Sequence, residues 1–208
     1  SSLLPHLRWL TDMNYTHVYY VDLKSKIVDV RIFPEDATHP GGWGTVLIGG
    51  LNFGGGTYEV DDFNQDGVSN DPRVFSSCYF ALDITNPGAP ELLWEFSDPT
   101  HLGFTTAYPA VARTGKEDEK GAWHVILGSG PTDYAGASDQ EASIFVLDLK
   151  TGDVLKRFEG GVIEPNSFMG GVATVDMNLD YQTNAAYLGN TYQSGGKWYG
   201  NLLRIFIS

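Results

Sequence analysis

Two segments of this 208-residue chain place oxygen-bearing side chains at every second position, a spacing that suits Ca²⁺. Calcium takes six or more oxygen ligands at about 2.4 Å, and alternation in a tightly turning loop directs successive odd residues toward a common centre. In the first segment Gly67 stands at position 6, where such a loop turns sharply, but Arg73 replaces the usual Glu at position 12. Asp71 or Asp61 must then supply the missing carboxylate. The predicted ligands are Asp62, Asn64, Asp66, the main-chain carbonyl of Val68, Asn70 and Asp71.

The second segment has the same alternation with fewer charges. Two of its four alternating ligands are Asn, and Tyr181 takes the place of the Gly preferred at position 6. Because fewer carboxylates mean weaker calcium binding, this loop is predicted to bind the ion less tightly than the first. Its predicted ligands are Asp176, Asn178, Asp180 and Asn184. For both loops the alternative is an Asx-rich turn that holds no ion.

No residue pattern in the chain predicts catalysis. The five histidines lack the HExxH spacing of a zinc protease, the glycine clusters lack the Lys-Ser/Thr of a phosphate loop, and there is no GxSxG motif. Cys78 is the single cysteine, which excludes an internal disulfide, a multi-cysteine zinc site and a CxxC redox centre. We therefore predict no catalytic residues and no enzyme activity.

The composition of the chain limits the classes of binding partner to be expected. The chain carries 26 Asp and Glu against 13 Lys and Arg, for a net charge of −13. Phosphate binding needs a basic face, so this balance argues against nucleic acid and anionic membranes. The sequence has no apolar run of the roughly 18 residues that a membrane span requires, and the first ten residues do not have the pattern of a signal peptide. The composition is compatible with a secreted or cell-surface protein.

The elements that must position these loops are strands. Nearly every apolar segment is short, rich in β-branched and aromatic residues, and bounded by Gly, Pro, Asn or Asp, which predicts an all-β chain. About twelve strands are expected. They are His17–Leu23, Val28–Phe33, Thr45–Gly49, Cys78–Ile84, Leu92–Phe96, Tyr108–Ala112, His124–Leu127, Ile144–Leu149, Val154–Phe158, Gly171–Val175, Ala185–Leu188 and Leu202–Ile207.

An internal repeat organises these strands. An aromatic-hydrophobic-Asp pattern ends at Asp22, Asp83 and Asp148, where the Asp is expected to cap the following turn, and Leu202–Ile207 fits the same slot. A unit of about sixty residues with some four strands predicts a β-propeller with quinoprotein-like blades. Blade starts are expected near residues 17, 77, 143 and 198, and residues 57–76 are predicted to be an insertion. Because a propeller needs four to eight blades, residues 1–208 are expected to be part of one.

Several segments, in order along nearly the whole chain, resemble the propeller domain of the PilC/PilY family, the tip-associated adhesins and assembly factors of type IV pili. They are Tyr15–Asp22, Asp29–Phe33, Gly41–Gly50, Phe53–Gly56, Tyr79–Pro87, Leu93–Asp98 and Gly200–Arg204. In that family the propeller is the C-terminal module of a protein several times this length. The resemblance places the family's calcium loop at Asp176–Asn184, where its occupancy is expected to control pilus retraction.

The resemblance implies a bacterial cell-surface protein that passes through the periplasm and sits with the minor pilins at the type IV pilus tip. Its expected role is to promote pilus extension over retraction and to support attachment to a host or surface receptor. Two alternatives stay open. A quinoprotein dehydrogenase shares repeats such as Phe145–Gly152, although a lone Cys78 cannot form the adjacent cysteine pair of its alcohol-oxidising members, and no basic cluster is visible to hold the quinone. The second alternative is a purely structural propeller that binds protein partners and holds no metal.

Overall fold

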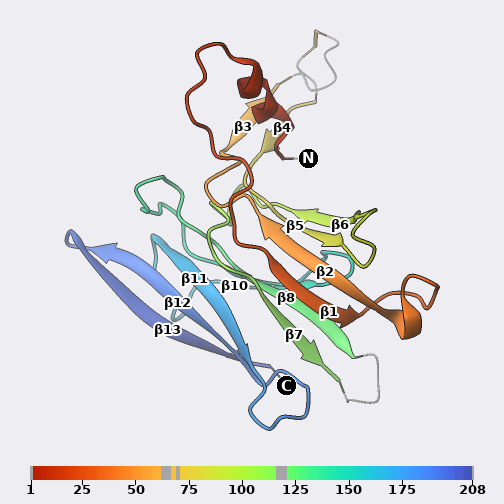
Figure 1. The fold of residues 1–208 in the computed structure, drawn as a ribbon. Coiled ribbons are helices and arrows are strands. Elements are labelled where there is room, and N and C mark those ends of the chain that lie inside the picture. The colour runs from red at the N-terminus through yellow and green to blue at the C-terminus, as the bar shows by residue number, and fades with distance from the viewer. Residues whose placement is uncertain (1, 62–66, 69–70, 116–120, 208) are drawn as a thin grey trace.

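The chain folds as antiparallel sheets that stand side by side. The computed structural model describes residues 2–61, 67–68, 71–115 and 121–207 (Figure 1). Within these ranges helix is limited to two short 3-10 segments, η1 (Leu4–Thr11) and η2 (Pro40–Gly42). The predicted all-β class is therefore confirmed. No helix in the described part of the chain is long and apolar enough to cross a membrane.

Consecutive strands pair antiparallel in each of the three main sheets. The first sheet has the order β1 (Lys26–Arg31), β2 (Trp43–Gly50), β5 (Tyr79–Asp83) and β6 (Glu91–Phe96). The second runs through β7 (Ala110–Thr114), β8 (Ala122–Gly128), β9 (Ile144–Asp148) and β10 (Val154–Phe158). The third contains β11 (Ser167–Val175), β12 (Ala185–Ser194) and β13 (Lys197–Phe206). Such meandering sheets are the blades of a propeller.

The core lies between the faces of neighbouring sheets. Val46 and Ile48 of the first sheet and Val125 and Leu147 of the second belong to one cluster of fully buried side chains. A second cluster joins the second sheet to the third and is centred on Ile126, Met169 and Leu188. The second sheet contributes to both clusters and so buries apolar side chains on both faces, whereas along β2 and β5 of the first sheet buried positions alternate with more exposed ones.

The repeated pattern marks one strand in each sheet. Of the predicted blade starts, those near 77, 143 and 198 fall beside β5, β9 and β13, each of which is third in its sheet, and the one near 17 falls on no strand, whereas the sheets themselves begin at Lys26, Ala110 and Ser167. In the first two sheets, the Asp that ends this third strand caps the turn that follows it. Asp83 accepts the N–H of Thr85 at 2.9 Å, and Asp148 accepts those of Lys150 and Thr151, both at 2.9 Å.

The predicted strand His17–Leu23 does not form. This segment runs without regular structure from η1 to β1, and Asp22 accepts the side-chain amide of Asn52 at 3.1 Å instead of capping a turn. The segment does not pair with the outer edge of β1 or β6, and it reaches the sheet at its end, where the Leu23 N–H donates to the Gly50 carbonyl at 3.3 Å. Val21 is accordingly 54% exposed.

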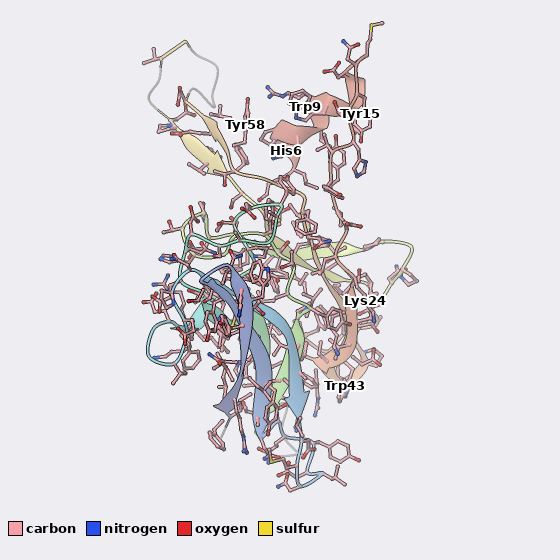
Figure 2. The ribbon with its side chains drawn as sticks, turned by 90° about the vertical axis from the view of Figure 1, so that its left-hand side faces the viewer. His6, Trp9, Tyr15, Lys24, Trp43 and Tyr58 are labelled. Carbon is pink, nitrogen blue, oxygen red and sulfur yellow. The ribbon has the colours of Figure 1, made fainter. Side chains whose placement is uncertain are left out.

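Residues 57–76 contain a separate hairpin of β3 (Tyr58–Val60) and β4 (Arg73–Phe75), which projects from the sheets beside η1 (Figure 1). Figure 2 shows His6, Trp9 and Tyr58 gathered where η1 meets this hairpin. Arg8 of η1 donates to the Tyr58 hydroxyl at 3.1 Å, and His6 Nε2 lies 3.1 Å from the Gly56 carbonyl oxygen. The N-terminal segment thus packs on the segment predicted to be an insertion.

Candidate metal-binding loop

The first acidic loop falls mostly on residues that the structure does not describe. Asp62, Asn64, Asp66 and Asn70 lie outside the described ranges. The others are placed. Gly67 has a φ of 83°, the left-handed conformation expected at the turn, Val68 is 56% exposed, and Asp71 lies in a β-bridge just before β4. Calcium binding here stays a prediction.

The second acidic loop, residues 176–184, connects β11 to β12 and is described in full. Its base is closed by the N–H of Asn184, which donates to the Val175 carbonyl at 2.9 Å. All four predicted ligands, Asp176, Asn178, Asp180 and Asn184, lie on this one connection. We call it the 176–184 loop.

Asp176 organises the turn. Its Oδ1 accepts the main-chain N–H groups of Leu179 at 2.8 Å and Asp180 at 3.3 Å, and its Oδ2 accepts that of Tyr181 at 2.8 Å. Three amides from successive residues therefore point at one carboxylate. This is the arrangement of an Asx-type turn, and it curls the chain around the side chain at position 1.

The other predicted ligands also form hydrogen bonds within the loop. Asp180 Oδ2 accepts side-chain amide N–H groups from Asn178 and Gln182, both at 3.0 Å, while its Oδ1 accepts the main-chain N–H of Gln182 at 2.9 Å. Asn184 Oδ1 accepts the N–H of Met177 at 2.6 Å. The side-chain oxygens of Asp176, Asp180 and Asn184 thus already accept N–H groups inside the loop.

The backbone of the 176–184 loop turns twice through the left-handed region. Leu179 has a φ of 61° and Tyr181 a φ of 64°. Tyr181 holds the position at which a calcium loop prefers Gly, and it takes the conformation that Gly would supply. For a non-glycine residue that conformation is strained by about 1–3 kcal/mol, so the surrounding contacts must hold it. The side chains of Leu179 and Tyr181 are 83% and 68% exposed and contribute little packing.

Sequence reasoning missed the residues that anchor this loop. Arg113 of β7 donates from its guanidinium Nη1 to the Tyr181 carbonyl at 3.0 Å, and its main-chain groups exchange hydrogen bonds with Thr183. Arg113 lies 68 and 70 residues from these partners, so no local pattern signals the contact.

The donors of the 176–184 loop fit a calcium ion in chemistry. They are all oxygens, and Asp176 Oδ2 and Asp180 Oδ1, which each accept one N–H within the loop, keep a lone pair for a cation. The charge is low, because Asp176 and Asp180 are its only carboxylates. In the described part of the chain no three His, Cys, Asp or Glu side chains lie close enough to hold a metal ion together. A calcium ion here would rest on two carboxylates, amide oxygens and main-chain carbonyls.

One histidine outside the loop is held between two carboxylates. His39 Nε2 lies 2.8 Å from Asp83 Oδ2, and its Nδ1 lies 3.2 Å from Asp36 Oδ1, while the Phe33 ring stacks on the imidazole with centroids 4.1 Å apart. Burial alone would lower the pKa of His39, but hydrogen bonds and charge attraction from Asp83 and Asp36 outweigh it, so the pKa is raised. The contact between His39 and Asp83 joins the connection between β1 and β2 to the end of β5.

Comparison with known proteins supplies the context of these sites. Residues 1–205 match the family model of the PilY1 beta-propeller domain. A protein named "Type IV pilus biogenesis factor PilY1" from Pseudomonas aeruginosa is 30% identical over 211 residues, which are 98% of this chain and 15% of that protein. A "Type IV pilus biogenesis factor PilY1 homolog" from Xylella fastidiosa is 26% identical over 223 residues, which are 100% of this chain and 12% of that protein.

A solved structure agrees with these matches. The crystal structure of the Pseudomonas aeruginosa PilY1 C-terminal domain superposes with a TM-score of 0.54 and 27% sequence identity, over 80% of this chain and 27% of that chain. The chain therefore spans a minor part of the proteins that it matches.

Proposed function

Because this chain belongs to the PilY1 beta-propeller domain family, we propose that it is a propeller module of a type IV pilus biogenesis protein. The observation that supports this most directly is the family match from residue 1 to residue 205, a range that contains the 176–184 loop and all of the three sheets except the last residue of β13. In this role the module acts at the bacterial cell surface, after passage through the periplasm, and takes part in pilus extension, retraction and attachment.

We propose that the module works by binding and not by catalysis. Its partners would be the minor pilins at the pilus tip and a host or surface receptor. The net charge of −13 favours partners with basic surfaces and slows approach to anionic membranes. Neither a nucleic-acid partner nor an enzymatic reaction is part of this role.

We further propose that Ca²⁺ regulates the module through the 176–184 loop. Asp176, Asn178, Asp180 and Asn184 would hold the ion, which when bound supplies positive charge and cross-links the two sides of the loop. The chain's own contribution is the closed base at Val175 and Asn184 and the curled backbone around Asp176. The first acidic loop, Asp62–Asp71, would provide a second calcium site.

The test is made in the bacterium that encodes the chain. Deletion of the segment for residues 1–208 should reduce surface pili and twitching zones, and Asp176→Asn with Asp180→Asn should alter the calcium dependence of twitching while the protein is still exported. Glu159→Gln, an exposed change far from the loop in sequence, is the matched control. Unchanged piliation in the deletion strain would refute the pilus role, and unchanged calcium dependence in the double variant would refute the calcium role alone.

A metal-free interaction module is the second candidate. The observation that favours it is that Asp176, Asp180 and Asn184 already accept N–H groups within the loop, so the turn is complete without an ion. Calorimetric titration with calcium decides between the two. Binding that is lost with Asp176→Asn supports the calcium switch, and no binding supports the metal-free module.

A further inference from the structure

Arg113 contacts the 176–184 loop from a different sheet. It lies on β7, the first strand of the second sheet, whereas the loop belongs to the third sheet. The guanidinium Nη1 donates to the carbonyl oxygens of Tyr181 at 3.0 Å and Gly115 at 3.3 Å. One side chain therefore bridges the loop and the end of β7.

The main chain of Arg113 binds the same loop. Its carbonyl accepts the N–H of Thr183 at 2.8 Å, and its N–H donates to the Thr183 hydroxyl oxygen at 3.1 Å. Three hydrogen bonds thus hold the two residues that flank Gln182. Because Gln182 is at position 7 of a calcium loop, where the main-chain carbonyl is a ligand, these bonds fix the backbone on both sides of that carbonyl.

The guanidinium is itself held in place. Its Cζ lies 5.9 Å from the centroid of the Trp123 ring, and Trp123 is the direct cross-strand partner of Arg113 on β8. The Trp123 ring meets Trp43 of the first sheet edge to face, with centroids 6.2 Å apart. Trp43 lies toward the end of the sheets away from η1 (Figure 2). A cation that stacks on an aromatic ring loses less freedom when it also donates hydrogen bonds.

From these contacts we propose that Arg113 is the positioning residue for the 176–184 loop, and that it holds Tyr181 in the left-handed conformation that glycine provides in other calcium loops. The part of this inference that concerns the calcium affinity of the loop rests on the proposed calcium role. The structural part, that Arg113 fixes the conformation of the loop, does not depend on a bound ion. Arg113 touches no ligand of the ion and acts through the carbonyl of Tyr181 and the amide of Thr183.

The structural part is tested by amide hydrogen exchange in the purified protein without calcium. Arg113→Gln should speed exchange at residues 179–184, and Thr183→Val should do so to a smaller degree. The matched control is Arg31→Gln, which removes an equal charge and an arginine hydrogen bond, here the one from Arg31 Nε to the Gly41 carbonyl of η2 at 2.8 Å. Unchanged exchange in both loop variants, or an equal change in Arg31→Gln, would overturn the proposal.

The calcium part is tested by calorimetry in an Asp66→Ala background, so that the heat reports the 176–184 loop. Arg113→Gln should weaken binding about tenfold, the scale of one charge-assisted hydrogen bond, although removal of a nearby positive charge would by itself tighten it. Tyr181→Gly in the Arg113→Gln protein should restore most of the affinity, because glycine needs no anchor there. Tighter binding in Arg113→Gln, or no rescue by Tyr181→Gly, would overturn the positioning role. If the unmodified loop binds no calcium, the calcium role fails and hydrogen exchange alone decides the proposal.

Discussion

Trp94 donates its indole N–H to the main-chain carbonyl of Leu149 at 2.9 Å, and this hydrogen bond joins the outermost strand of the first sheet to the second sheet. Trp94 is 6% exposed. Gly152, with a φ of 75°, lies so close that a Cβ there would come within 2.6 Å of the Trp94 ring. The contact between the first two sheets therefore depends on a tryptophan and on the glycine that admits it.

We expect Trp94→Phe to lower the free energy of unfolding by about 1–3 kcal/mol, because the buried carbonyl of Leu149 loses its donor. Urea unfolding followed by fluorescence measures the loss. Trp198→Phe is the control, since Trp198 is 50% exposed and should change stability by no more than about 0.5 kcal/mol. Equal effects in the two variants would contradict a special role for the Trp94 hydrogen bond.

The raised pKa of His39 predicts a pH dependence of stability. A histidine whose pKa is higher in the folded state stabilises the fold fully below its unfolded pKa of about 6.5, and this contribution is lost as pH rises through the folded value. The difference in melting temperature between the wild-type protein and His39→Gln should therefore be larger at about pH 5.5 than at about pH 8.5. Both Asp36 and Asp83 face the imidazole, so Asp83→Asn should reduce the same pH dependence.

The control for this pH effect is His17→Gln, because the exposed His17 ring has an edge contact with Tyr19. A pH-dependent difference of equal size in His17→Gln would contradict an origin of the effect in the Asp36 and Asp83 contacts of His39. A difference for His39→Gln that does not depend on pH would show that the two carboxylates do not stabilise the protonated imidazole.

Cys78 is expected to be chemically inert in the folded protein. The thiol is 2% exposed, and burial raises its pKa to about 11. Since the thiolate is the reactive form, a disulfide reagent at about pH 8 should modify the native protein at least about a hundredfold more slowly than the urea-unfolded protein. In urea one thiol per chain should react, as the sequence requires. Rapid modification of the native protein would mean that the thiol becomes exposed by local opening.

The fold class and the repeat were predictable because both follow from residues close in sequence. The turn-capping Asp83 and Asp148 agree with the sequence pattern. The strand prediction at His17–Leu23 was wrong because the segment forms no ladder with any strand in the described part of the chain, a long-range condition that no local pattern contains. Propensity describes a segment, whereas strand formation also requires a free neighbour.

The ligands of the candidate site could be predicted from the sequence, but the residues that hold its loop in place could not. The alternating oxygens of Asp176–Asn184 are visible in the sequence, and the structure places them on one turn. Arg113 and the Asp83 partner of His39 are 68 and 44 residues from the groups they contact, and their residue types are common on any surface. Contacts of this kind appear only once the sheets are placed side by side.

The absence of a vicinal cysteine pair predicts that the protein shows no quinone-dependent redox activity. Pyrroloquinoline quinone carries carboxylates that need basic side chains, and this chain has a net charge of −13 with Cys78 as its single cysteine. Titration with the quinone should give no saturable change in absorbance, and an alcohol-dependent dye assay should show no turnover. Saturable binding with turnover would support the quinoprotein alternative.

The two acidic loops should differ in calcium affinity. The Asp62–Asp71 loop has Gly67 at its turn and carboxylates at Asp61, Asp62, Asp66 and Asp71, whereas the 176–184 loop has two carboxylates and a tyrosine at the turn. The first should therefore bind more tightly, with dissociation constants of about 10⁻⁴–10⁻³ M typical of extracellular modules.

A ligand at a hundred times its dissociation constant adds about 2.7 kcal/mol to the free energy of unfolding, so calcium should produce a measurable rise in melting temperature. Asp66→Ala should remove most of that rise, and Asp180→Ala a smaller part, because the tighter site contributes more at any calcium concentration. If Asp180→Ala removes the larger part, the affinity order is reversed, and the contacts of Arg113 with Tyr181 and Thr183 compensate for the missing glycine and carboxylates. If calorimetry detects no binding up to about 10 mM calcium, both loops are turns held by their own hydrogen bonds, and the calcium switch is refuted for this chain.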